Sequence, residues 1–368
     1  MIYIHQKPQW PDFKWDNDAL LPALSQVRSL QGKLLGKMEL VGFQLRDQAM
    51  LKTLTADVVT SSEIEGEMLD SEQVRSSIAR KLGMDIAGLV PSDRDVDGVV
   101  ELMLDATQHY DTALTNERLF GWHAALFPSG RSGMHKITVG SWRKGETGPM
   151  QVVSGPLGKE RVHFEAPESA LVPKEMQQFL QWFNAKNSVE PVLKSGIAHL
   201  WFVTIHPFDD GNGRIARAIA DMQLSRADET NLRFYSVSKQ IEQNRKSYYE
   251  ILELTQKGSL DITIWLQWYL RILQDALNDT DEMLENVMFK ARFWEKHAAT
   301  SFNKRQYIML NKILDNFYGK LTTGKWAKIA KCSPDTALRD IQDLMDKGIL
   351  EKEPGGGRST SYTIKSSS

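Results

Sequence analysis

The 368-residue sequence contains a single cysteine, Cys332, which excludes an intrachain disulfide. No stretch approaches the roughly 18 uncharged apolar residues of a membrane-spanning helix. The N-terminus lacks a basic segment followed by an apolar run, so no signal peptide is predicted. The 45 basic and 47 acidic side chains leave a net charge of -2, so no overall field attracts the chain to nucleic acid or to membranes. We therefore expect a cytoplasmic protein that does not associate with membranes.

The hydrophobic pattern predicts a mainly α protein. Apolar residues recur at helical spacing over residues 16–68 and 71–110, and in several segments between 174 and 294. Between residues 137 and 173, glycines and prolines separate short β-rich runs, which predicts a β-hairpin at about 150–164 within the helical fold. We expect an N-terminal helical region (1–90), a core (91–295) and a C-terminal domain (296–368).

The C-terminal domain has its own charge and pattern. Residues 301–368 hold 12 basic and 7 acidic side chains, a net of +5, whereas the rest of the chain carries -7. Three helical segments and two short β-runs predict a winged helix-turn-helix, with Ser333 and Pro334 starting its third helix. Arg339 and Arg358 could contact phosphates. The aspartates of the third helix oppose DNA entry, so DNA is a partner that the sequence allows but does not favour, beside protein contact or a homodimer. These aspartates are Asp335, Asp340, Asp343 and Asp346.

Polar chemistry concentrates between His206 and Arg217, in the sequence HPFDDGNGRIAR. Pro207 ends the preceding helical pattern, and the next helix begins within the Asp-Gly-Asn-Gly stretch. A glycine-rich loop at a helix N-terminus lets backbone N–H groups converge on an anion, which the helix dipole also favours. Arg214 and Arg217 share one helix face and lean back toward this loop.

These residue types predict a site for a polyphosphate. Asp210 offers an oxygen ligand for Mg²⁺, which commonly binds one or two carboxylates together with phosphate oxygens. His206 at the loop entrance is a natural general base. A dinucleotide-binding loop would need a strand before Gly211, and the preceding pattern is helical. The stretch from Gly319 to Lys325 approaches a P-loop but has Trp326 in place of Ser or Thr, and an EF-hand would need a terminal Glu.

The segment resembles the full signature of the Fic family (filamentation induced by cyclic AMP), H-x-F-x-[D/E]-G-N-G-R-x-x-R. The resemblance implies a helical core with a β-hairpin flap, and transfer of AMP from ATP to a hydroxyl side chain (Ser, Thr or Tyr) of a target protein. His206 would deprotonate that hydroxyl, Asp210 would hold Mg²⁺, and Phe208 would anchor the loop in the core. The phosphates of ATP would be bound by Gly211, Asn212, Gly213, Arg214 and Arg217.

A second resemblance lies upstream, where Ser61-Ser62-Glu63-Ile64-Glu65-Gly66 is similar to the inhibitory motif of the family, [S/T]-x-x-x-E-[G/N]. It implies an N-terminal inhibitory helix carrying Ser61 and Glu65, with an ion pair between Glu65 and Arg217 that keeps this arginine from the γ-phosphate. The bland alternative is an acidic, exposed helix end.

By the same resemblance, Asn244 and Tyr248 would lie near the nucleotide base, although tyrosines at this spacing also suit a core. We therefore predict an autoinhibited, magnesium-dependent protein adenylyltransferase. Two alternatives stay open. The same site could remove AMP from a modified protein, or the chain could be a DNA-binding regulator that senses a nucleotide.

Overall fold

The computed structural model describes residues 2–40, 43–86, 88–145, 148–155, 159, 161–186, 188–314, 319–353 and 360–365. It is mainly helical with a few short strands, as predicted. The chain divides into two compact units, Met1–Asp281 and Glu282–Ser368. The predicted region 1–90 and most of 91–295 lie together in the first unit. None of the described helices combines the length and the apolar character that crossing a membrane requires.

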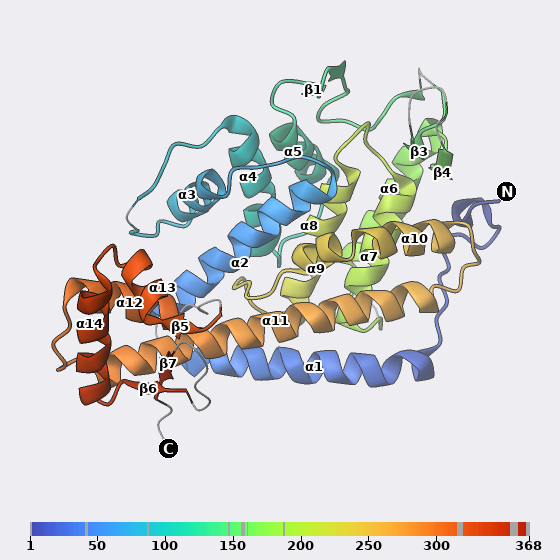
Figure 1. The fold of residues 1–368 in the computed structure, drawn as a ribbon. Helices are drawn as coiled ribbons and strands as arrows, with labels where there is room; N and C mark the ends of the chain where they lie inside the picture. Colours follow the sequence, from blue (N-terminus) through green and yellow to red (C-terminus); the bar gives the residue numbers. More distant parts are fainter. Residues whose placement is uncertain are drawn as a thin grey trace. The chain divides into compact units, whose positions relative to one another are not determined.

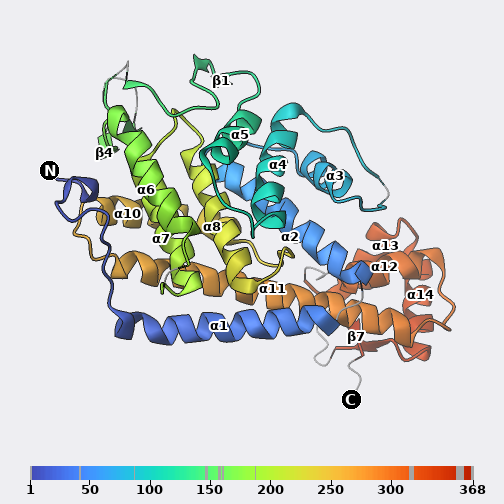
Figure 2. The same cartoon turned by 180° about the vertical axis from the view of Figure 1, so that it is seen from behind.

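Helices make up most of the first unit (Figure 1). In chain order they are α1 (Asn17–Leu40), α2 (Phe43–Ile64), α3 (Ser71–Lys81), α4 (Arg94–Gln108), α5 (Asn116–Leu126), α6 (Val172–Asn184), α7 (Pro191–Ile205), α8 (Asn212–Asp228), α9 (Val237–Gln243) and α10 (Arg245–Gln256), and α11 (Thr263–Lys296) continues into the second unit. α1 and the first part of α11 lie side by side in both views (Figures 1 and 2). Lys33 and Lys37 of α1 both pair with Asp281 of α11.

The helices α7 and α8 form the centre of this unit. Every residue of α7 from Val192 to Ile205 is buried, which is typical of a core helix that is covered on all sides. Glu190 caps α7 by accepting hydrogen bonds from the N–H groups of Val192 and Leu193 at 2.8 and 2.9 Å. α2, α4 and α5 pack against α8. The two helices that flank the loop between α7 and α8 are therefore both held in the core.

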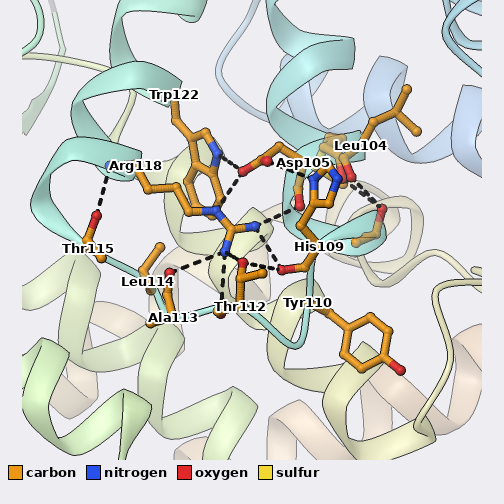
Figure 3. Close-up of polar contacts among 12 residues, drawn as sticks. Leu104, Asp105, His109, Tyr110, Thr112, Ala113, Leu114, Thr115, Arg118 and Trp122 are labelled. Carbon is orange, nitrogen blue, oxygen red and sulfur yellow. Dashed lines mark hydrogen bonds and ion pairs between the residues drawn. The ribbon is translucent and has the colours of Figure 1, made fainter.

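A polar network fixes α5 on α4 (Figure 3). Asp105 of α4 accepts hydrogen bonds from Arg118 Nε and Trp122 Nε1 of α5, both at 2.6 Å, and from His109 Nδ1 at 3.0 Å. Arg118 also donates to the carbonyl of His109 at 3.1 Å and to the hydroxyl of Thr112 at 2.7 Å. These bonds satisfy carbonyl groups at the end of α4, which have no partner within the helix. They hold α5 against α4, and His123 of α5 in turn contacts the loop that follows α7.

Two hairpins separate α5 from α6. The first, β1 (Arg131–Ser132) with β2 (His135–Lys136), was not predicted. The second, β3 (Gln151–Ser154) with β4 (Arg161–Glu165), lies where the sequence predicts a hairpin. Its register shifts between Val152 and Val153, which marks a bulge. Glu253 of α10 holds this hairpin against α10 by accepting hydrogen bonds from Arg161 at 2.9 Å and from His163 at 2.6 Å.

The second unit combines α12 (Lys304–Leu314), α13 (Thr323–Ile329) and α14 (Pro334–Asp346) with a three-stranded antiparallel sheet. The sheet has the order β5 (Leu321–Thr322), β7 (Ser361–Ile364), β6 (Leu350–Lys352). Trp326, Ile341 and Leu344 lie in its core. Ser333 caps α14 as predicted, accepting from the N–H of Thr336 at 3.2 Å. The predicted turn 354–357 and Arg358 lie outside the described residues.

Three details of the predicted helices are wrong. The continuous pattern over 16–68 is two helices, α1 and α2. Apolar residues recur at helical spacing from 240 to 255, which predicts one helix. The helix breaks at Asn244, whose side-chain amide donates to the carbonyl of Gln240 at 2.9 Å while its backbone leaves the helical region. Residues 1–15 are rich in aromatics and hold two prolines, which predicts an extended arm, but they contain the 3₁₀ helix η1 (Ile4–Gln6). Ile4 is fully buried, so hydrophobic packing decides the conformation there.

Candidate active site

The loop between α7 and α8 depends on two residues with left-handed backbone. His206 ends α7 with φ 51° and ψ 60°, and Gly211 precedes α8 with φ 79°. Glycine is required at 211 for a second reason, because a Cβ there would lie 2.9 Å from the ring of Phe127. The chain thus turns sharply twice within six residues.

Phe208 anchors this loop, as the resemblance implied. It is fully buried, and its ring stacks on His123 with 4.2 Å between the ring centroids. Asn212 closes the loop: its Oδ1 accepts from the N–H of Phe208 at 3.0 Å, and its Nδ2 donates to the carbonyl of Phe208 at 2.9 Å. The Asn212 side chain is therefore committed to holding the loop. Only its backbone N–H is left to face a phosphate.

His206 is arranged as a base. Its Nδ1 lies 3.3 Å from the carbonyl of Val203, and a carbonyl only accepts, so we assign the proton to Nδ1 and leave Nε2 free. Burial lowers the pKa of His206 to about 4, although the bond to Val203 opposes this shift. The imidazole is consequently neutral at physiological pH and can accept a proton.

Arg143 holds the backbone at His206, a role that no pattern in the sequence indicates. The side-chain Nε of Arg143 donates to the carbonyl of His206 at 2.8 Å, and its backbone N–H donates to the carbonyl of Pro207 at 2.9 Å. The other end of the guanidinium donates to the carbonyl of Pro167. Arg143 is 5% exposed, and burial lowers its pKa. It joins the loop to the segment that follows the β3–β4 hairpin.

Asp210 retains room for a cation. One carboxylate oxygen accepts from the N–H of Gly211 at 2.6 Å, and the other accepts from the hydroxyl of Ser132. Each oxygen has a second lone pair for a metal. No group of three or more His, Cys, Asp or Glu in the described part of the chain could hold a metal ion by itself. Asp210 therefore fits Mg²⁺ in the way that this ion usually binds, with phosphate oxygens and water completing its shell.

Arg217 is the most enclosed charge of the site, with 2% of its side chain exposed. It donates to the hydroxyl of Ser61 at 2.9 Å and to the Ser61 carbonyl at 2.7 Å, and it pairs with Glu65 at 2.8 Å. Burial is the largest influence and lowers the pKa of Arg217, but Glu65 together with Tyr248 and Tyr249 outweighs it, so the net shift is upward. The Glu65 carboxylate also lies against Gly213, where a Cβ would come within 2.0 Å of its oxygen. Ser61, Glu65 and Arg217 thus meet at the N-terminus of α8.

Arg214 lies one turn earlier on α8 and is 3% exposed. Its guanidinium forms an ion pair with Glu67 and lies 5.1 Å from the centre of the Phe127 ring. The sequence analysis did not predict the ion pair between Arg214 and Glu67. Both arginines of the loop segment are therefore paired with carboxylates that follow α2.

A cavity of about 730 Å³ opens beside these groups. Its lining includes Glu65, His206, Gly213, Tyr248 and Val153 of the β3–β4 hairpin. Tyr248 is 2% exposed, and its hydroxyl lies 2.9 Å from Nε2 of His199. Asn244, expected near Tyr248 at the nucleotide base, bonds Gln240 instead, and the lining of this cavity does not include it.

Comparison with known proteins identifies the fold. Residues 113–224 match the Fic/DOC family, and residues 3–84 match a Domain of unknown function (DUF4172). The chain is a Fic family protein. A Fic family protein from Desulfovibrio desulfuricans G20 shares the fold at a TM-score of 0.54 and 20% identity, over 95% of this chain and 97% of that one.

Two curated relatives match the loop-bearing part of this Fic protein. A probable protein adenylyltransferase of Aquifex aeolicus is 27% identical over 124 residues, which cover 34% of this chain and 36% of the relative. The protein adenylyltransferase Fic of Drosophila grimshawi is 38% identical over 87 residues, which cover 23% of this chain and 17% of the relative. The matches therefore span about a third of the first relative and about a sixth of the second.

Proposed function

We propose that this Fic protein is a protein adenylyltransferase that transfers AMP from ATP to a hydroxyl group of a target protein. One observation carries the proposal: a neutral His206, the N-terminus of α8 at Gly213, and the cavity beside them lie together, with Arg214 and Arg217 on the same helix. Such a set can bind a triphosphate and accept a proton next to it. The adenylyltransferase names of the curated relatives support the same activity.

Each functional residue of the loop has a separate role in the proposed reaction. Nε2 of His206 takes the proton from the attacking hydroxyl, whose oxygen bonds to the α-phosphorus. The bond from that phosphorus to the β-phosphate oxygen breaks, and pyrophosphate leaves with the electron pair. Arg214, Arg217 and the backbone N–H groups of Asn212 and Gly213 stabilise the charge on the leaving group. Mg²⁺ held by Asp210 would add positive charge beside the same phosphates.

We further infer that Glu65 inhibits this activity. Nε and Nη2 of Arg217 donate to Ser61, and Nη1 forms an ion pair with Glu65. These groups are therefore not directed at a γ-phosphate. A carboxylate touching Gly213 also repels any phosphate at the N-terminus of α8. Glu65 therefore opposes productive ATP binding both by occupying Arg217 and by its own charge.

Mass spectrometry after incubation with ATP and Mg²⁺ tests both statements. We expect the wild type to stay unmodified and Glu65→Gly to gain AMP on itself or on an added target. Glu65→Gly combined with His206→Ala should gain none. If Glu65→Gly transfers no AMP to any protein in a lysate, the proposed transfer is wrong. If Glu65→Gly instead loses an ability to release AMP from modified protein, the site runs the reverse reaction.

DNA binding by the second unit is a second candidate activity, and one observation favours it. Two aspartates that were expected to oppose DNA are used inside the unit. Asp340 is 4% exposed and accepts from Arg305 at 2.7 Å. Asp343 accepts from Gln306 at 2.7 Å and Lys347 at 2.6 Å. Arg339 is left on the exposed face of α14.

The segment before α14 supports the same interpretation. Between Asp315 and Asp335 the chain has four lysines and no acidic residue, and Lys328 and Lys331 are exposed. In a helix-turn-helix, the first helix and the turn contact phosphates while the second helix enters the major groove. Lysines of α13 and the turn match the phosphate-contacting part of this arrangement.

Fluorescence anisotropy with a labelled DNA duplex of mixed sequence tests this candidate. Lys328→Ala with Lys331→Ala should weaken binding and reduce the slope of log affinity against log salt by about two. Lys304→Ala with Lys312→Ala, which removes two exposed lysines of α12, serves as the charge-matched control. No binding at low salt, or equal loss in the control, would exclude DNA as the partner of this surface.

A further inference from the structure

A second acidic residue, Glu67, contacts the nucleotide site independently of Glu65. Its carboxylate pairs with Nη1 of Arg214. The two partners differ in exposure: the Arg214 side chain is 3% exposed, whereas that of Glu67 is 45% exposed. Arg214 is thus enclosed by the protein on most sides. The carboxylate covers part of the remaining approach to its guanidinium.

The turn after α2 determines where both carboxylates lie. Gly66 adopts a left-handed conformation with φ 85°. The N–H of Gly66 donates to the carbonyl of Glu63 at 2.9 Å, and that of Glu67 donates to the carbonyl of Ser62 at 3.0 Å. These two bonds form a Schellman motif, which ends the helix in a fixed geometry. Glu65 and Glu67 therefore leave one rigid turn and reach two arginines on neighbouring turns of α8.

The surroundings of Glu67 are unfavourable apart from Arg214. Burial raises the pKa of Glu67, and the nearby carboxylates of Asp210, Glu65 and Asp95 act in the same direction, while Arg214 opposes them. A carboxylate among other carboxylates is stabilised by a cationic neighbour. The contact with Arg214 is therefore the interaction that stabilises this position of the Glu67 side chain.

We propose that Glu67 is a second inhibitory carboxylate, which keeps Arg214 from the phosphates of ATP as Glu65 keeps Arg217. This inference rests on the proposed function, because it assumes that Arg214 binds a phosphate of the nucleotide. It implies that Glu65→Gly releases only one of the two arginines. Full exposure of the triphosphate site then requires that both carboxylates leave.

Titration calorimetry with inorganic triphosphate isolates the arginine contacts from those of the base. We expect Glu67→Gln to tighten triphosphate binding by about two- to fivefold, the range for loss of a half-exposed ion pair. Glu65→Gly with Glu67→Gln should bind more tightly than either single variant. Glu67→Asp, which keeps the charge but shortens the reach to Arg214, should also tighten binding. Glu63→Gln removes a neighbouring acid of α2 that has no ion pair among the described residues, and it should bind like the wild type.

The outcomes separate this inference from the proposed function. If Glu67→Gln binds triphosphate as the wild type does while Glu65→Gly still transfers AMP, the function stands and the role of Glu67 is wrong. If Glu67→Asp binds like the wild type while Glu67→Gln binds more tightly, general charge rather than the Arg214 contact is responsible, and the inference also fails. If no variant binds ATP or triphosphate, both the inference and the proposed function are refuted. Circular dichroism at each step verifies that the variants are folded.

Discussion

His123 of α5 contacts the loop between α7 and α8, and it should make the stability of the protein depend on pH. Its ring stacks on Phe208, its Nε2 lies 3.2 Å from the carbonyl of Asp210, and its Nδ1 lies 3.2 Å from the N–H of Gly140. The N–H of Gly140 can only donate, so Nδ1 must be unprotonated and Nε2 carries the proton. Adding a second proton would place two donors face to face.

The magnitude follows from linkage. Burial lowers the pKa of His123 from 6.5 to about 4, although the bond to Asp210 opposes the shift. Because the folded pKa is the lower one, the unfolded chain takes up a proton first as the pH falls below 6.5. The stability that depends on a neutral His123 is complete above this pH and is lost progressively toward pH 4. Between about pH 7 and about pH 5 the loss amounts to about 2 kcal/mol.

Urea denaturation of the wild type and of His123→Asn at these two pH values measures this term. The asparagine does not titrate, and the other buried histidines are the same in both proteins. We expect His123→Asn to be less stable at pH 7 and the gap between the two proteins to narrow by about 2 kcal/mol at pH 5. A gap that stays constant with pH would refute the reasoning, because His123 would then titrate alike in both states.

Further predictions concern the loop and its inhibitory turn. Since burial lowers the pKa of His206 to about 4, the transfer rate of Glu65→Gly should stay level from about pH 8 to about pH 6; a half-loss near pH 6.5 in a rate profile would contradict this. Arg143→Met should lower the unfolding free energy by about 2–4 kcal/mol and reduce the transfer rate without weakening ATP binding, as denaturation and calorimetry would test. Gly66→Ala should cost about 1 kcal/mol at its positive φ and give partial activation, visible as a transfer rate between those of the wild type and Glu65→Gly.

Local chemistry explains which parts of the site could be predicted. Pro207, Gly211 and Asn212 act within a few residues of themselves, so the sequence alone indicates a tight loop before α8. His123 and Arg143 act across 87 and 63 residues, on the carbonyls of Asp210 and His206. Neither has a distinctive spacing to its partner. Such contacts depend on how α5 and the segment before β3 pack, which no periodicity in the sequence encodes.

The breaks in the helices were hard to predict for a related reason. Apolar residues continue at helical spacing across Asn244, so the pattern gives no sign that α9 ends there. The decisive interaction is a single side-chain bond from Asn244 to the carbonyl of Gln240, which competes with the helix. In α14, spacing alone does not reveal that Asp340 faces Arg305 on α12. Asp340, one of the four aspartates expected to oppose DNA entry, is therefore neutralised within the unit.

The packing of α2 on α8 rests on contacts that do not involve Glu65. Arg217 meets Ser61 and Glu65, and one turn further along α8, Asp221 lies buried near Asp57 of α2 and pairs with Arg233 at 2.6 Å. Burial and the Asp57 carboxylate raise the pKa of Asp221 well above its usual value, so these groups form a buried polar layer of their own. That layer and the bonds from Arg217 to Ser61 hold α2 without any contribution from Glu65. We therefore expect removal of the Glu65 carboxylate to free one edge of Arg217 while α2 stays docked, so that Glu65→Gly remains folded under the conditions of the transfer assay.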